Sequence, residues 1–151
     1  MEDIEDFKKS IGKKSRLLGI DPGKKRVGIA ISDENKLVST PLKTIIKKNN
    51  TNVINDILEI IKENNIKGIV VGNPINMDGS KGPSSQSAKD FAKNLSNNIS
   101  IPIVMWDERL SSQGAFNLSS NLNINTSKKV EKLDQNAASF ILQGAIDYIK
   151  R

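Results

Sequence analysis

The chain has 151 residues, with 23 basic against 17 acidic side chains and a formal net charge of +6, and this length suits one compact domain with its own core. It contains no cysteine and no histidine, which excludes disulfides, thiolate nucleophiles, Cys/His zinc sites and histidine general bases. Any chemistry must therefore use carboxylates, hydroxyls, lysine, arginine or a metal ion bound through oxygen.

The first 14 residues, MEDIEDFKKSIGKK, are charged and show no apolar period. They predict a mobile leader or a loosely docked helix, and not a signal peptide. No apolar run approaches the length of a membrane span, so we expect a cytoplasmic protein with a single domain over residues 15–151. The basic balance favours a polyanionic partner such as nucleic acid, although AT-rich coding also produces chains rich in Lys, Asn and Ile.

Two short apolar runs, at residues 17–20 and 27–31, predict the first two strands. A Pro-Gly pair between them permits a tight reversal, so the strands are expected to form an antiparallel hairpin. Asp21 directly follows the first run. It is either a turn residue that accepts a hydrogen bond from the backbone of Lys24, or a functional acid that the turn holds in place.

The rest of the chain alternates between helix and strand patterns. Residues 37–46 predict a third strand, and Pro41 makes it an edge strand because proline cannot donate to a ladder. The next predicted elements are a helix capped by Thr51 or Asn52 and ending near Asn64, a buried strand at 68–72 and a polar loop at 73–83. A helix from Ser84 or Ser85 and a strand at 101–106 follow. The chain is then predicted to continue with a helix through Ala115 and Leu118, a basic connection at 123–132, and a last helix from about Asp134 to the C-terminus. This order predicts an α/β fold with helices on both faces of a mixed five-stranded sheet, in strand order 3-2-1-4-5.

Three acids from distant segments are expected to meet at one edge of this sheet. Asp21 and Glu108 follow strands whose carboxyl ends lie side by side, where ligands bind in open α/β sheets. Asp134 shares a helix face with small residues that let the helix approach the sheet closely. Three carboxylates in one cleft repel one another or raise their pKa values, and Mg²⁺ or Mn²⁺ would relieve this. Two such ions, about 4 Å apart, activate water and stabilise the leaving oxygen in phosphodiester cleavage.

Four ordered blocks of the sequence resemble those of the YqgF (RuvX) family: DPGKKRVGIAISD, VVGNPINMDGSKG, WDERLSS and LDQNAASFILQGAIDY. The resemblance covers residues 17–148 and implies the RNase H-like fold of Holliday-junction resolvases. The family is described both as a Holliday-junction resolvase and as a nuclease that matures the 5′ end of pre-16S rRNA. By similarity, Asp21, Glu108 and Asp134 are its catalytic, metal-binding acids.

The chain departs from the family pattern at two positions. Lys24 stands where the family usually has Thr, and Asn73 stands where it usually has Leu. In addition, the fourth strand ends without the acid that many RNase H-like nucleases carry near that position. Glu108 from the next strand would have to take over the role of that acid.

Several residues beside the predicted metal cleft have two interpretations. Four cations either position substrate phosphates or form a solvated turn and a surface ion pair; they are Lys24, Lys25, Arg26 and Arg109. Asp107 is expected to cap the following turn or to support the site, with Glu108 as the ligand. The glycine-containing loop at 73–83 either presents backbone N–H groups to a phosphate or is a plain crossover.

Three classes of function fit these patterns. The leading one is a metal-dependent nuclease that cleaves pre-16S rRNA, as a monomer or homodimer, or a resolvase of branched DNA, which needs two sites in a dimer. The second is an actin-like ATPase or sugar kinase, which also uses Asp-x-Gly hairpins but closes two domains over its nucleotide. The third is a catalytically silent nucleic-acid-binding protein, against which the three acids argue because carboxylates without metal repel phosphate.

Overall fold

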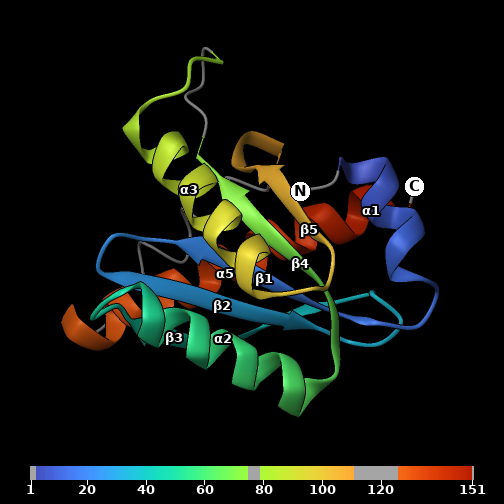
Figure 1. The fold of residues 1–151 in the computed structure, drawn as a ribbon, viewed down its shortest axis with the longest axis horizontal. Coiled ribbons are helices and arrows are strands. Elements are labelled where there is room, and N and C mark those ends of the chain that lie inside the picture. Colours follow the sequence, from blue (N-terminus) through green and yellow to red (C-terminus); the bar gives the residue numbers. More distant parts are fainter. Residues whose placement is uncertain (1–2, 75–78, 111–125, 151) are drawn as a thin grey trace.

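A computed structural model describes residues 3–74, 79–110 and 126–150 (Figure 1). Its sheet has the strand order β3-β2-β1-β4-β5. The strands are β1 (Arg16–Pro22), β2 (Arg26–Ser32), β3 (Ser39–Ile46), β4 (Ile66–Asn73) and β5 (Ile103–Asp107). The helical elements are α1 (Ile4–Ile11), α2 (Asn50–Asn64), α3 (Pro83–Asn98), the 3₁₀ turn η1 (Glu108–Leu110) and α5 (Thr126–Ile149).

The strand pairing confirms the predicted topology. β1 runs antiparallel to β2 and parallel to β4, and β4 runs parallel to β5. β3 pairs with β2 alone and so lies at the edge, as Pro41 predicted. The carboxyl ends of β1, β4 and β5 therefore lie side by side.

Each face of the sheet carries its own apolar core. Because side chains alternate along a strand, Leu18 and Ile20 of β1 join the core that contains α2 and α3 residues, while Leu17 joins the core under α1 and α5. Figure 1 shows α2 and α3 in front of the sheet and the long helix α5 behind it. Helices thus cover both faces, as expected.

Helix α5 approaches the sheet closely because glycines face it. A Cβ on Gly28 would collide with the carbonyl oxygen of Asp134, and one on Gly19 would lie 2.6 Å from the Cβ of Leu142. The small residues predicted on the helix face, Ala138 among them, are buried. The close approach therefore depends on small residues in both partners, with glycine in the strands and alanine in the helix.

The N-terminal segment is a docked helix and not a mobile leader. Phe7 and Ile11 of α1 are buried in the core beside α5, and Asp3 caps the helix by accepting from the backbone N–H of Asp6 at 2.9 Å. The ammonium group of Lys36 donates to the carbonyl of Lys13 at 2.6 Å and so fastens the connection after α1. With the partly buried Ile4, Phe7 and Ile11 make three apolar residues spaced over two turns, which is too few to stand out as a period.

The start of the last helix differs from the prediction. α5 begins at Thr126 and not near Asp134, so residues 126–132 of the predicted basic connection are helical. Lysine and glutamate are good helix formers even without an apolar stripe, which explains the error. Asp134 consequently lies inside the helix, and its interpretation as a helix-start residue is wrong. The predicted helix through Ala115 and Leu118 lies outside the described residues.

Two other helix starts also shift. The N-cap of α2 is Asn49, which forms a reciprocal capping box with Asn52, so neither Thr51 nor Asn52 is the cap. α3 begins at Pro83, one residue before the earliest predicted start. No helix in the described part of the chain combines the length and apolarity needed to cross a membrane.

Candidate active site

Asp21 lies near the carboxyl end of β1, one residue before the hairpin turn. It pairs in register with Gly28 on β2, and a Cβ on Gly23 would collide with the carbonyl of Arg26, so the turn depends on glycine. Among residues 3–74, 79–110 and 126–150, no hydrogen bond reaches the Asp21 carboxylate, and the turn bond from Lys24 is thus absent there. Burial raises the pKa of Asp21 to about 6, and the charge of Asp134 adds to this rise.

Glu108 begins η1, immediately after β5, and reaches over the end of β4. Its carboxyl carbon lies 3.4 Å from the position that a Cβ on Gly72 would take, beside Ile141 of α5. Burial raises the pKa of Glu108 to about 7, and the charges of Asp21 and Asp107 raise it further. Glu108 therefore lies on the α5 face of the sheet, close enough to Asp21 to be affected by its charge.

Asp134 reaches the same edge from α5. Its backbone packs on Gly28, and its Oδ2 accepts from the Nε of Arg26 at 2.8 Å. The side chains of Asp134 and Arg26 are 22% and 37% exposed. The charge of Asp134 also contributes to the raised pKa of Asp21. The structure thus brings the three predicted acids to one edge of the sheet, with Asp134 paired to a cation.

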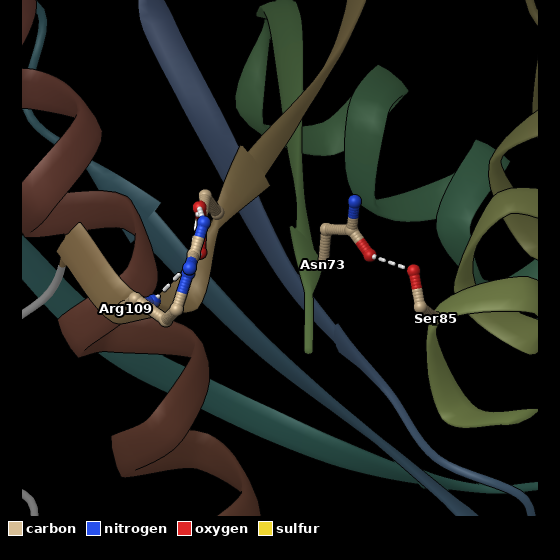
Figure 2. A network of polar contacts seen from close by, with 4 residues as sticks. Asn73, Ser85 and Arg109 are labelled. Atoms are coloured by element: carbon tan, nitrogen blue, oxygen red, sulfur yellow. Dashed lines mark hydrogen bonds and ion pairs between the residues drawn. The ribbon is translucent and has the colours of Figure 1, made fainter. Parts of the chain in front are cut away.

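The predicted cations differ in their surroundings. Lys24 and Lys25 are exposed in the hairpin turn, whereas Arg26 is paired with Asp134. The guanidinium of Arg109 binds the Asp107 carboxylate, with Nη2 2.6 Å from Oδ2 and Nε 3.0 Å from both oxygens (Figure 2). Asp107 also accepts from the backbone N–H of Arg109 at 3.0 Å, as expected of a capping residue. The hydrogen bond from Arg109 lowers the pKa of Asp107.

A further polar pair, whose contact the sequence did not predict, closes the α3 side of the same strand ends. The Oγ of Ser85 donates to the Oδ1 of Asn73 at 2.8 Å, and both residues are buried (Figure 2). Asn73 is the last residue of β4 and pairs in register with Asp107, so it belongs to the strand and not to the predicted loop. The sequence signal for this pair was that Asn73 stands where the family usually has Leu, because a buried amide needs a hydrogen-bond partner.

The donor set is suited to a divalent cation. The Asp21 and Glu108 carboxylates are both desolvated, and within the described residues neither accepts a hydrogen bond from a protein group. Hard oxygen ligands and surplus negative charge are what Mg²⁺ and Mn²⁺ prefer. Within the described ranges, however, no three acidic side chains lie close enough together to hold a metal ion as they stand.

Comparison with known proteins relates the chain to nucleases. A family model described as "RuvX: Holliday junction resolvase" matches residues 15–148. A "Putative pre-16S rRNA nuclease" of Pelagibacter ubique (strain HTCC1062) is 56% identical over 146 residues, which are 97% of each chain. A protein of the same name from Ruegeria sp. (strain TM1040) is 44% identical over 147 residues, covering 97% of this chain and 94% of its own.

Solved structures share the fold at low sequence identity. Thermus thermophilus RuvC matches with a TM-score of 0.56 and 11% identity, covering 88% of this chain and 95% of its own. The yeast mitochondrial Holliday junction resolvase Ydc2 matches with a TM-score of 0.53 and 12% identity, covering 97% of this chain and 84% of its own. These likenesses confirm the predicted RNase H-like fold.

Proposed function

The chain belongs to the RuvX family, and from that premise we propose that it is a divalent-metal-dependent nuclease that processes the 5′ end of pre-16S rRNA. The relatives named as pre-16S rRNA nucleases match this chain over nearly their full length. One observation carries the proposal of catalysis: at the carboxyl ends of the strands, burial raises the pKa of both Asp21 and Glu108, the charge of Asp134 adds to the rise at Asp21, and the charge of Asp21 adds to the rise at Glu108. A binding module would gain nothing from this arrangement, because bare carboxylates repel phosphate.

Asp21, Glu108 and Asp134 would hold Mg²⁺ or Mn²⁺, and we propose two ions. When bound, the ions would activate a water molecule and stabilise the leaving oxygen of the phosphodiester. The chain's own contribution is positional. β1 and η1 fix Asp21 and Glu108 against the sheet, the glycines of β2 and β4 admit α5, and partial burial reduces the screening of the acids by water.

The cations around the site would bind the substrate. Lys24 and Lys25 lie in the exposed hairpin turn that follows Asp21 and would contact phosphates along the substrate RNA. Arg109, oriented by Asp107, would stabilise charge on a phosphate next to Glu108. We further propose that the protein works in the cytoplasm, where pre-rRNA is processed, and that it does so as a monomer or a homodimer.

Cleavage of four-way DNA junctions is the second candidate, favoured by the description of the matching family model. A resolvase must cut two strands symmetrically, so this function requires a dimer with two active sites. Processing of an RNA end has no such requirement. A monomeric active species would therefore exclude the resolvase, whereas a dimer would be compatible with both candidates.

The proposal is tested by cleavage of two labelled substrates, a pre-16S rRNA 5′ fragment and a four-way DNA junction, with Mg²⁺ or Mn²⁺. Wild type and Asp21→Asn would be compared with Glu59→Gln, a control that neutralises an exposed acid of α2 on the opposite face of the sheet. We expect metal-dependent cleavage of the RNA by wild type and the control, lost in Asp21→Asn. Cleavage of the junction alone would establish the resolvase. If neither substrate is cut while wild type and Asp21→Asn bind equally well in EDTA, the catalytic proposal fails and the protein is a silent binding protein.

A further inference from the structure

The contact between Arg26 and Asp134 joins residues 108 positions apart in the chain. Arg26 begins β2, and Asp134 lies in α5, whose backbone packs on the same strand at Gly28. The contact is made at one point, from Nε to Oδ2 at 2.8 Å, and is not the two-pronged fork that arginine and carboxylate can form. Among the described residues, Asp134 is the one side chain that Arg26 pairs with, which leaves both terminal Nη groups for another acceptor.

The pair influences how the proposed ligand set is assembled. Asp134 is near enough for its charge to affect Asp21, yet within the described residues no three acids lie close enough together to hold a metal ion. Arginine stays charged at every accessible pH, so it remains a competitor for the Asp134 carboxylate. A metal ion that drew Asp134 into the ligand set would therefore have to displace this contact.

Arg26 is also placed to take a new partner. Its side chain is 37% exposed, and it directly follows Lys24 and Lys25 in the turn. Its planar guanidinium matches the geometry of a phosphate, to which it can donate two parallel hydrogen bonds. Release from Asp134 would thus give the hairpin a third cation beside the cleaved strand.

We propose that Arg26 is a positioning residue that exchanges partners: it holds Asp134 before metal binds, releases Asp134 to the metal site, and then binds a phosphate of the substrate RNA. This inference rests on the proposed function. It assigns Arg26 two successive contacts, so that metal binding prepares the protein for its substrate. The exchange is distinct from a fixed support, in which Arg26 would hold Asp134 throughout.

Binding of Mn²⁺ to the protein without RNA, measured by calorimetry, tests the first half of the exchange. Arg26→Gln removes the competitor, and Lys24→Gln is the matched control because it removes one positive charge two residues away. We expect Arg26→Gln to bind Mn²⁺ about fivefold more tightly than the control. If Arg26→Gln bound Mn²⁺ no more tightly than Lys24→Gln does, the loss of one positive charge alone would explain its affinity for Mn²⁺, and the exchange would be overturned. Weakened binding would show a fixed support and would overturn it as well.

The second half is tested by the Michaelis constant for the pre-16S rRNA fragment at saturating Mn²⁺. Arg26→Gln should raise KM several-fold while kcat changes little, so that metal affinity and substrate affinity move in opposite directions. A general loss of structure would weaken both. Arg26→Lys, which keeps the charge but loses the fork, should fold in any case, bind Mn²⁺ like wild type and still show a raised KM. An unchanged KM in both variants would overturn the exchange.

The wild-type measurements separate the two levels of the proposal. If wild type binds no Mn²⁺ and cleaves neither substrate, the proposed function fails, and the exchange fails with it. If wild type binds Mn²⁺ and cleaves RNA while Arg26→Gln does not bind Mn²⁺ more tightly than the control, the nuclease stands and the exchange alone is wrong.

Discussion

The same edge of the sheet has two sides that differ in how their polar groups are satisfied. On the α3 side, Asn73 is bonded by Ser85, and Asp107 is bonded by Arg109. On the α5 side, Asp21 and Glu108 have raised pKa values and, within the described residues, accept no hydrogen bond. Satisfied buried groups are normal in a stable fold, whereas unsatisfied ones persist where function requires them. The contrast supports the proposal that the chemistry takes place on the α5 side.

The largest expected effect comes from neutralising, one at a time, the two neighbouring acids Glu108 and Asp107. Glu108→Gln should lower single-turnover cleavage on the order of 10³-fold, because it removes a proposed metal ligand. Asp107→Asn should stay within about tenfold of wild type, since this acid binds Arg109 on the other side of the sheet. The two variants differ by one position, which makes them a matched pair. The reverse ranking would assign the ligand role to Asp107 and break the contrast between the two sides.

The second prediction concerns the close approach of α5. Gly28→Ala places a methyl group against the backbone of Asp134, which cannot yield without moving the helix, whereas Gly68→Ala meets the side-chain ends of Phe7, Ile11 and Leu17. We expect Gly28→Ala to lower the free energy of unfolding by about 3 kcal/mol and Gly68→Ala by less. Urea unfolding measures both. Equal losses would mean that α5 shifts as easily as side chains do, and that glycine in β2 does not fix the position of Asp134.

Much of the fold could be predicted because it depends on local patterns. The apolar runs and the turn at Gly23 predicted the hairpin, Pro41 predicted the edge strand, and the alternation of helix and strand predicted the parallel order that aligns the strand ends. From that order alone, Asp21 and Glu108 could be expected at one edge of the sheet. These inferences need only chain order and the handedness of crossovers.

The remaining features depend on how distant elements pack. The partner of Arg26 is set by the rotation of α5 about its axis and by the absence of a side chain at Gly28, and neither can be read from spacing along the chain. The start of α5 was missed because residues 126–132 lack an apolar stripe, although their helix propensity is high. The sequence left residues 1–14 open between a mobile leader and a docked helix, because two buried residues, Phe7 and Ile11, make a short apolar pattern.

The smallest expected effects concern stability, and they should have opposite signs on the two sides of the sheet. The pKa of Asp21 is raised to about 6 in the folded protein from an ordinary value of 3.8, so folding favours its protonated form. The stability that the protonated Asp21 side chain contributes to the folded protein is fully present below pH 3.8 and is lost as the pH rises through 6. Asp21→Asn, which carries no charge, should therefore raise the free energy of unfolding by about 2 kcal/mol at pH 8 in EDTA, and the gain should shrink below pH 6.

Asp107→Asn should do the opposite, because Arg109 lowers the pKa of Asp107 in the folded protein. The stability that this acid contributes is present above its unfolded pKa and is lost as the pH falls through its folded pKa. The variant should lose about 1 kcal/mol at pH 8, since the pair is partly exposed, and the loss should vanish in acid. Urea unfolding of both variants between pH 4 and pH 8 measures the two slopes. If both variants destabilised the protein at pH 8, the Asp21 carboxylate would have a partner in the fold, and the α5 side would be as satisfied as the α3 side.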